Sequence, residues 1–275
     1  MGAIDARTVL VTGATDGLGR ALAADLARAG AVVLVHGRSP ERVERTVAEL
    51  ASEATEHPHG YVADFADLAQ VARLAEELTR DHDRLHVLVN NAGIGAGPPG
   101  GARETSADGH ELRLQVNFLA PFLLTRLLLP LLRAGAPARI VHVASGAQQT
   151  IDLDDLMLER GYDGWRAYGQ SKLAMVADAF DLAEQLDPSE VTVNALHPAS
   201  QMDTKMVRES VGRAQRPLDE GVAAVWHLVT SPELAGITGR YFSGQREARA
   251  AAQAYDRTVR AALMRRARHI TDLDG

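Results

Sequence analysis

Short runs of apolar, β-branched residues alternate along this chain with longer stretches in which apolar residues recur every three or four positions. Such alternation is typical of βαβ units that build a parallel sheet. The short runs predict seven strands, at residues 9–12, 31–36, 60–63, 85–89, 139–144, 191–196 and 239–242. The longer stretches predict helices at about residues 20–29, 40–54, 68–82, 110–133, 165–186 and 218–230. We therefore expect an α/β fold: a doubly wound, seven-stranded parallel sheet with helices on both faces, in three layers.

One domain accounts for the whole predicted pattern. A chain of 275 residues with 46% hydrophobic residues has the size of one large α/β domain, so we assign residues 1–275 to it. Ser39 followed by Pro40 predicts the start of one helix, and Gly30 predicts the end of another. The Arg- and Ala-rich tail at residues 245–275 predicts a solvated helix with a frayed end, with docking or oligomerisation as the alternative role.

The composition narrows the classes of function. A net charge of -7 and a pI of about 5.8 argue against a nucleic-acid partner, which would need a basic surface. The lack of cysteine excludes disulfides, thiolate catalysis and Cys-ligated metal. The most apolar stretch, residues 118–132, is interrupted by Pro121 and Pro130 and is too short to cross a bilayer. No leader-like segment opens the sequence. We expect a cytoplasmic protein with no membrane span and no metal, and a solvated surface position for His57 and His59.

A glycine-rich segment follows the first predicted strand and opens the first predicted helix. It reads Thr12-Gly13-Ala14-Thr15-Asp16-Gly17-Leu18-Gly19, which has the spacing G-x-x-x-G-x-G. Glycines at such a turn let backbone N–H groups approach a pyrophosphate at the positive end of a helix. Tight turns without a ligand also use glycine, and it is the strand-turn-helix context that favours a dinucleotide site.

Tyr168 and Lys172 form a Y-x-x-x-K pair in the predicted helix at residues 165–186. The chain has five tyrosines and only two lysines, Lys172 and Lys205, among its 29 basic residues, so chance accounts poorly for this spacing. Residues four apart share one face of a helix. A cation beside the phenol favours phenolate and is expected to lower the pKa of Tyr168 from its reference value of about 10. Tyr168 is therefore a candidate acid and base.

Further motifs follow in the order of a known family. Asn90-Asn91-Ala92-Gly93 ends the fourth predicted strand, Asn117 lies in the long helix after it, and Ser145 ends the fifth strand. With these motifs, about residues 7–243 resemble the short-chain dehydrogenase/reductase family, whose nucleotide turn has the spacing G-x-x-x-G-x-G. The resemblance implies a Rossmann-type fold and an oxidoreductase that interconverts a carbonyl and an alcohol, with a nicotinamide cofactor carrying the hydride.

The resemblance also implies roles for single residues. Tyr168 would exchange a proton with the substrate oxygen, and Ser145 would hydrogen-bond that oxygen. Lys172 would hold the nicotinamide ribose, and Asn117 a relay water. Taken alone, Ser145 could simply be a turn residue at the end of a strand, and Asn117 could be a helix residue that hydrogen-bonds the backbone. The order of the motifs favours the catalytic roles for both. The implied cofactor site comprises Gly13, Thr15, Asp16, Gly17, Leu18, Gly19, Arg38, Asp64, Phe65, Asn91, Ala92, Gly93, Tyr168, Lys172 and Pro198.

The choice of cofactor is predicted from the residues after the second strand. Relatives that prefer NAD usually carry an acid where Gly37 stands, whereas the guanidinium of Arg38 suits a 2′-phosphate. Relatives that prefer NADP often have a basic residue at the position of Asp16, so Asp16 argues against a preference for NADP. We expect NADP(H) to be preferred, with NAD(H) as the alternative. Asp64 resembles the family residue that meets the adenine amino group, and helix N-capping is an equal interpretation.

A long segment, residues 146–167, separates Ser145 from Tyr168. Its sequence, which includes Tyr162 and Trp165, resembles the retinol-dehydrogenase-like branch of the family and weakly favours a bulky or lipid-like carbonyl. Because it joins two of the implied catalytic residues, we expect it to form part of a substrate lid.

The segment after the sixth strand departs from the family pattern. The family's usual Pro-Gly is replaced by Pro198-Ala199, followed by residues 200–202, which predicts a substrate loop of different shape. His197, just before the proline, suits either a contact with the substrate pocket or a packed position.

Two other functions fit the same fold. A nucleotide-binding sensor without catalysis would be expected to lose the tyrosine, and a sugar-nucleotide epimerase or dehydratase would normally bring a larger C-terminal substrate domain. The sequence favours the oxidoreductase, with a small-molecule carbonyl or alcohol as its partner. By resemblance to the family, we expect a homodimer or homotetramer that pairs through the helices at residues 110–133 and 165–186.

Overall fold

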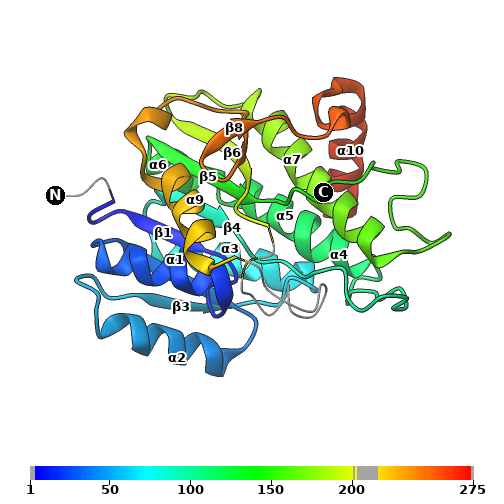
Figure 1. Cartoon of the computed structure of the whole chain (residues 1–275). Coiled ribbons are helices and arrows are strands. Elements are labelled where there is room, and N and C mark those ends of the chain that lie inside the picture. Colours follow the sequence, from blue (N-terminus) through cyan, green and yellow to red (C-terminus); the bar gives the residue numbers. More distant parts are fainter. Residues whose placement is uncertain (1–3, 201, 203–215, 274–275) are drawn as a thin grey trace.

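The chain forms one mixed sheet with helices on both faces (Figure 1). The structure, a computed structural model, describes residues 4–200, 202 and 216–273. Over these residues the sheet has eight strands in the order β3-β2-β1-β4-β5-β6-β7-β8. All seven predicted strands are present as parallel neighbours, and the doubly wound, Rossmann-type, three-layer fold is confirmed. Their bounds are β1 (Thr8–Val11), β2 (Val32–Gly37), β3 (His59–Val62), β4 (Val87–Asn90), β5 (Ala138–Val143), β6 (Val191–His197) and β7 (Tyr241–Ser243).

The eighth strand was not predicted. β8 (Arg246–Ala248) pairs antiparallel with β7 at the edge of the sheet, with Tyr241 opposite Ala248. Gly244, whose φ is +60°, lies in the tight turn between them. β8 has only three residues and contains no run of apolar side chains, so its sequence shows no strand pattern. From the sequence, all residues from 245 onwards are therefore assigned to the C-terminal tail.

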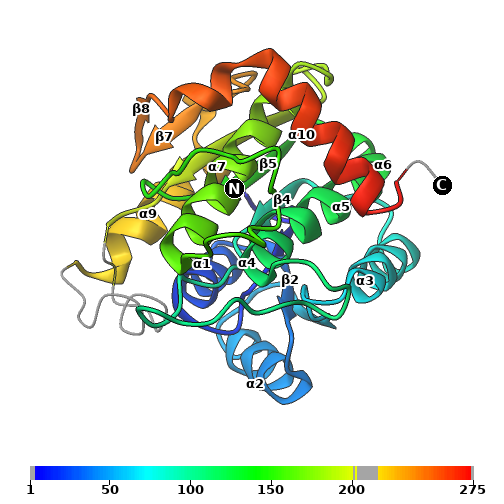
Figure 2. The same cartoon turned by 90° about the vertical axis from the view of Figure 1, so that its right-hand side faces the viewer.

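Helices cover the two faces of the sheet separately (Figures 1 and 2). One face carries α1 (Gly17–Arg28), α2 (Pro40–Ala51) and α9 (Leu218–Thr230), and the other carries α3 (Leu68–Asp81), α5 (Ala120–Leu127) and α7 (Gly164–Ala183). The predicted start of α2 at Ser39-Pro40 and the predicted end of α1 at Gly30 are confirmed. The backbone N–H of Arg42 donates to Ser39 Oγ at 3.4 Å, and Gly30 follows α1 with a φ of +89°.

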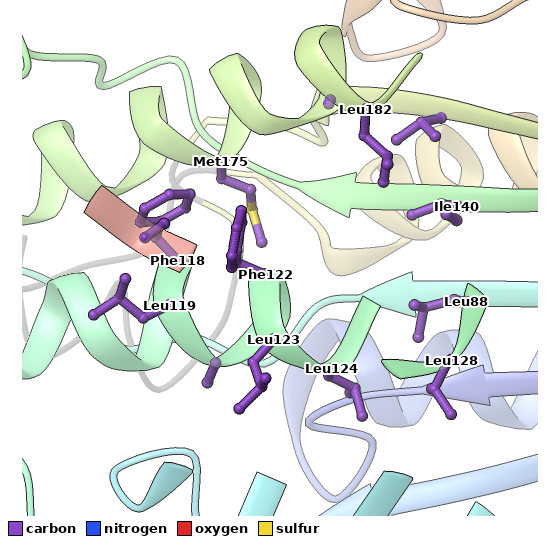
Figure 3. Close-up of a cluster of buried hydrophobic side chains, with 14 of the residues drawn as sticks. Leu88, Phe118, Leu119, Phe122, Leu123, Leu124, Leu128, Ile140, Met175 and Leu182 are labelled. Atoms are coloured by element: carbon purple, nitrogen blue, oxygen red, sulfur yellow. The ribbon is translucent and has the colours of Figure 1, made fainter. Parts of the chain in front are cut away.

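The long helix predicted at residues 110–133 is divided into four parts. A short α4 (Leu112–Leu114) leads into a π turn, η1 (Gln115–Leu119), and then into α5; α6 (Leu129–Ala134) follows after a break. Pro130 lies in the first turn of α6, where the lack of an N–H costs least. Figure 3 shows Phe118 and Phe122 from this region facing Met175 of α7 across the core. Apolar periodicity alone does not show such a π turn, because the core face continues through it.

The tail is a helix, as predicted, but it is docked rather than solvated. After η3 (Ala252–Tyr255), α10 (Arg257–Ile270) lies along α7 (Figure 2). Leu263, Met264 and Ala267 are buried in the same cluster as α5 and α7, and Met264 Sδ lies 3.9 Å from the guanidinium of Arg126 on α5. The many arginines suggested a solvated helix. All of those in α10 except Arg260, which is buried and pairs with Glu184, are exposed on the outer face, and the apolar residues of the inner face are buried.

The sheet topology sets the place of the site. β1 lies between β2 and β4, so the chain leaves the carboxyl ends of β1 and β4 in opposite directions. A crevice opens at such a switch point in doubly wound sheets, and ligands bind there. The glycine-rich turn and the Asn90-Asn91-Ala92-Gly93 motif both lie at this point.

Candidate active site

The glycine-rich turn has the close packing that its spacing predicts. Gly13 and Gly17 have positive φ angles of +66° and +48°, which favour glycine. A side chain at Gly19 would collide with the carbonyl oxygen of Gly13 and the amide of Asn91. Asp16 is the N-cap of α1, because its Oδ1 accepts from the backbone N–H of Gly17 at 2.8 Å. The turn therefore holds the N-terminus of α1 against the carboxyl edge of the sheet, a suitable place for a pyrophosphate.

Thr12 and Asn91 join this turn to the motif after β4. The backbone N–H groups of Asn91 and Ala92 both donate to Thr12 Oγ1 at 2.9 Å. In return, the side-chain amide of Asn91 donates to the carbonyl of Thr12 at 2.8 Å. These reciprocal hydrogen bonds fix the two loops of the switch point relative to each other.

His36 is a functional residue of the turn that sequence reasoning missed. It is buried at the end of β2, where Nδ1 accepts from the backbone N–H of Gly13 at 3.2 Å and Nε2 lies 3.1 Å from the carbonyl oxygen of Ala63. Its ring stacks on Phe65 with centroids 4.5 Å apart. Burial lowers the pKa of His36 to about 4, so the ring is neutral and Nε2 carries the hydrogen that Ala63 accepts. A polar residue within an apolar strand was the available signal.

The four residues with implied catalytic roles lie close together. Tyr168 and Lys172 lie one helical turn apart on α7, with Lys172 Nζ 5.9 Å from the centre of the phenol ring. The side chain of Ser145, at the end of β5, hydrogen-bonds the phenol. A Cβ added to Gly93 would lie 3.0 Å from Asn117 Oδ1 and 3.3 Å from Lys172 Nζ, which places the β4 motif against the same group.

The predicted lowering of the Tyr168 pKa is wrong for this structure. Burial of the phenol raises its pKa, and the hydrogen bond from Ser145 opposes this only in part. Lys172 is itself 3% exposed, donates from Nζ to the carbonyl oxygen of Val143 at 2.9 Å, and has a pKa lowered by burial to about 8. The cost of removing the phenol and the lysine from water outweighs the attraction between a phenolate and the cation, and the sequence does not show this burial. Tyr168 is accordingly protonated at neutral pH.

Asn117 binds backbone rather than the open cavity. Its Oδ1 accepts from the backbone N–H of Ile94 at 2.8 Å, and its Nδ2 donates to the carbonyl of Ile94 at 3.1 Å and to Ser171 Oγ at 2.9 Å. The residue is fully buried in the π turn η1, and it does not line the cavity. π turns are frequent at functional sites. The side chain of Asn117 therefore braces the loop after Gly93, and its relay-water role stays a prediction.

A cavity of about 810 Å³ runs from the glycine turn to Tyr168. All fifteen residues of the implied cofactor site line it, together with Ser145 and His197. Trp165, from the predicted lid segment, also lines the cavity. Sequence reasoning missed several other lining residues, namely His36, Ser39, Arg42, Glu104, Leu112, Arg113 and Val116. Several of these lie at the starts of α2 and α4, whose positions depend on how the helices enter the site. Gln201 of the predicted substrate loop and Lys205 lie outside the described residues.

Asp64 does not cap a helix. Asp67 is the N-cap of α3, and its Oδ1 accepts from the backbone N–H groups of Ala69 and Gln70. Asp64 instead accepts from the backbone N–H of Ala66 at 2.9 Å, in a turn that lines the cavity. Of the two interpretations of Asp64, the capping one is wrong and the adenine contact stays a prediction.

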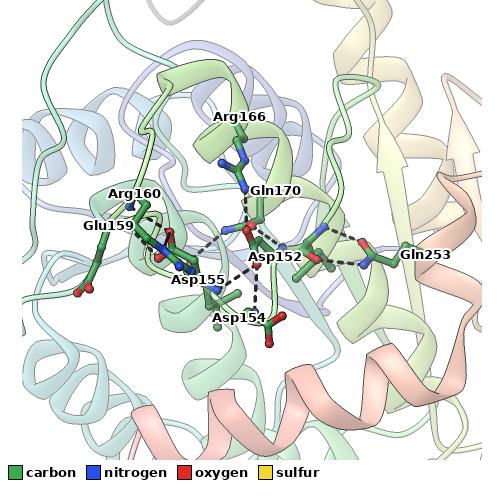
Figure 4. Close-up of polar contacts among 10 residues, drawn as sticks. Asp152, Asp154, Asp155, Glu159, Arg160, Arg166, Gln170 and Gln253 are labelled. Carbon is green, nitrogen blue, oxygen red and sulfur yellow. Dashed lines mark hydrogen bonds and ion pairs between the residues drawn. The ribbon is translucent and has the colours of Figure 1, made fainter.

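The segment between Ser145 and Tyr168 is tied to both α7 and the tail (Figure 4). Gln253 of η3 binds both backbone groups of Ile151, accepting at 2.6 Å and donating at 3.0 Å. The backbone N–H of Asp152 donates to Gln170 Oε1 at 2.8 Å, and Arg166 contacts the Asp152 carboxylate at 2.8 Å. These contacts fix the first half of the segment, so any lid motion belongs to the part nearer Trp165.

The fold, the glycine turn at its switch point and the lined cavity define the protein as a nucleotide-binding enzyme of the Rossmann type. Comparisons with known proteins narrow this class. Residues 7–214 match the family model described as short chain dehydrogenase. The chain belongs to the short-chain dehydrogenase/reductase family, in its retinol-dehydrogenase-like branch, and is an oxidoreductase that acts on CH–OH groups.

Individual relatives are similar over nearly the whole chain. Retinol dehydrogenase 14 from Mus musculus is 36% identical, over 94% of this chain and 84% of its own. A solved structure from Mycobacterium paratuberculosis superimposes with a TM-score of 0.79 at 27% identity, covering 99% of this chain and 97% of that one. The RhlG/NADP active-site complex from Pseudomonas aeruginosa has a TM-score of 0.71 at 28% identity, covering 87% and 95%. The NADP in that complex shows that a structural neighbour binds this cofactor.

Proposed function

We propose that this protein interconverts a ketone or aldehyde and an alcohol with NADP(H), using Tyr168 as acid and base. The observation that carries the proposal is that Tyr168, Ser145 and Lys172 meet at one end of a cavity whose other end is the glycine turn. The nicotinamide ring would supply or accept the hydride there. The test is NADPH depletion with aldehydes, cyclic ketones, 3-oxoacyl thioesters and quinones. No turnover with any of these classes would contradict the proposal.

The side chains suit proton transfer in the direction of reduction. The raised pKa keeps Tyr168 protonated at neutral pH, so the phenol donates to the carbonyl oxygen as the hydride reaches the carbon. Ser145 Oγ accepts from the backbone N–H of Ala147 at 3.0 Å. When substrate binds, the Ser145 hydroxyl would turn its hydrogen from Tyr168 to the substrate oxygen. The ammonium of Lys172 then stabilises the phenolate that remains.

The adenosine end of the cavity supports a preference for NADP(H). Arg38 is exposed, lines the cavity and makes no hydrogen bond or ion pair with another described residue, so its guanidinium is available to a 2′-phosphate. A Cβ added to Gly37 would lie 2.5 Å from Thr15 Cγ2, and an acid that binds the ribose hydroxyls finds no room there. The RhlG complex is consistent with this preference in the fold.

Arg38→Leu should raise the KM for NADPH about tenfold or more and leave the KM for NADH nearly unchanged. A hydrogen bond to a charged group contributes about 1.5–3 kcal/mol, and about 1.4 kcal/mol corresponds to a tenfold change. Steady-state kinetics with both cofactors measures the effect. Arg45→Leu is the matched control, because Arg45 is exposed on α2, the helix that follows Arg38, and does not line the cavity. A wild-type protein that uses NADH as efficiently as NADPH would refute the preference.

The substrate end of the cavity favours a bulky apolar carbonyl compound. Trp165 stands at its rim with 42% of its surface exposed, edge-on to Tyr168 at 6.0 Å between ring centres. Retinol dehydrogenase 14 is named for an alcohol of this kind. We predict that Trp165 fluorescence changes when cofactor and substrate bind, because the substrate passes the indole and closes the lid. Unchanged emission and unchanged hydrogen exchange at residues 156–165 would refute the lid.

The expected homodimer or homotetramer has to use a face that α10 leaves free. The helices predicted to pair, α5 and α7, are covered by α10 of the same chain, so pairing through them requires that α10 is displaced. We therefore predict association through another face. Light scattering on the full chain tests it, and a monomer at micromolar concentration would refute the predicted oligomer.

The cellular location also stays a prediction. No helix in the described part of the chain is long and apolar enough to cross a membrane. We propose a cytoplasmic protein, which fractionation of cells producing the full chain would test.

A further inference from the structure

One ion pair at the adenosine end of the cavity joins two residues that lie far apart in the sequence. Arg42, in the first turn of α2, places Nη2 2.9 Å from Asp16 Oδ2. The same nitrogen donates to the carbonyl oxygen of Thr15 at 3.1 Å. The pair therefore binds the first turn of α2 to the glycine turn that precedes α1, and both residues line the cavity beside Arg38.

Asp16 stabilises the start of α1, but it also places a negative charge beside the proposed 2′-phosphate site. As the N-cap of α1 it satisfies the backbone N–H of Gly17, and an N-cap of this kind stabilises a helix by about 1 kcal/mol. Yet its second oxygen carries a negative charge to the edge of the site, where 55% of the side chain is exposed. A 2′-phosphate bound at Arg38 would meet this charge unless another group opposes it.

Among the described residues that line this end of the cavity, Arg42 brings the charges into balance. Two cations, Arg38 and Arg42, line the adenosine end together with two carboxylates, Asp16 and Asp64. Without Arg42 the set would have an excess negative charge, and a dianionic phosphate would be repelled. The N-terminus of α2, capped by Ser39, adds a positive helix end to the same wall.

We propose that Arg42 is a specificity-determining residue, which makes Asp16 compatible with a 2′-phosphorylated cofactor by neutralising its carboxylate. The inference rests on the proposed use of NADP(H). It explains how this chain carries an acid where its NADP-preferring relatives often carry a base. Arg42 supplies that positive charge from α2, and Asp16 keeps its role as the cap of α1.

The test measures binding of 2′,5′-ADP and 5′-AMP, which differ by the 2′-phosphate and need no turnover. Calorimetry is performed on the full-length wild type, Arg42→Gln, Asp16→Asn and the double variant, with Arg45→Gln as the control on the same helix. Asn keeps an oxygen acceptor for the backbone N–H of Gly17, so the cap of α1 is retained. Arg42→Gln should weaken 2′,5′-ADP binding about five- to tenfold and change 5′-AMP binding less than about twofold.

The double variant distinguishes neutralisation from direct contact with the phosphate. If Arg42 acts by opposing Asp16, Asp16→Asn alone should tighten 2′,5′-ADP binding severalfold, and it should restore the double variant to near the wild-type affinity. An unchanged affinity in Arg42→Gln, or a double variant as weak as Arg42→Gln, would overturn the inference. A wild type that binds both nucleotides equally would instead refute the NADP(H) proposal on which the inference depends.

Discussion

Tyr168→Phe should lower kcat by about 10²- to 10⁴-fold, which is the usual contribution of a positioned general acid. The variant keeps the ring that contacts Trp165 and loses only the hydroxyl that meets Ser145. Cofactor affinity and melting temperature should therefore stay near the wild-type values. Steady-state turnover at saturating NADPH measures the loss of kcat, and a thermal melt measures whether the stability is retained.

A second tyrosine provides the matched control for this variant. Tyr162 also carries a partly buried hydroxyl, 3.4 Å from Glu111 Oε1, but it does not line the cavity. Tyr162→Phe removes the same atom and should leave kcat within about twofold of the wild type, because no general acid is lost. Near-wild-type turnover in folded Tyr168→Phe would show that the proton comes from elsewhere, and the proposed mechanism would fail with it.

Lys172→Arg should lose at least about 100-fold in turnover, although the charge is preserved. The ammonium is 3% exposed, donates to the carbonyl of Val143, and lies so near Gly93 that a methyl group there would be 3.3 Å from it. A planar guanidinium is larger and presents its donors in a fixed fork, so it cannot occupy this space with the same geometry. Turnover, NADPH affinity and melting temperature measure the effect. A folded, fully active Lys172→Arg would refute the assignment.

The pH dependence gives an independent check on Lys172. Because burial lowers its pKa to about 8, the wild type should lose reductase activity as the pH rises through about 8, well below the range of an exposed lysine. Between that pH and the unfolded-state pKa near 10.4, the unfolded chain binds more protons than the folded one. This residue therefore makes folding more favourable as the pH rises there. Alkaline loss of activity that coincides with unfolding would contradict this explanation.

The apolar pattern predicted the sheet well because every central strand is buried on both faces. Runs such as Thr8–Val11 and Val87–Asn90 have no exposed position, so they are continuous in the sequence as well as in the core. The order of the motifs also identified the four residues with implied catalytic roles, and the structure places them close together. These predictions depended on residues that are close together in the sequence. A parallel sheet brings the carboxyl ends of its strands to one edge, so motifs that follow the strands lie near one another.

The remaining features depend on contacts between distant residues. Asp16 and Arg42 form their pair only because α2 enters beside the glycine turn, and His36 acts only because β3 brings Ala63 to its ring. The covering of α7 by α10 likewise arises from tertiary packing. Amphipathic periodicity showed that the tail forms a helix, and its high arginine content concealed the narrow apolar stripe.

The attachment of Gln253 to Ile151 has a consequence for chains that are cut short by proteolysis or by premature termination. Residue 253 follows all eight strands, so a chain that ends just before it keeps the whole sheet but lacks this anchor of the segment between Ser145 and Tyr168. Such a chain also lacks α10, so the apolar face of α7 is uncovered. Apolar surface exposed in this way favours aggregation. A truncated chain would therefore form the sheet and still aggregate more readily than the full chain.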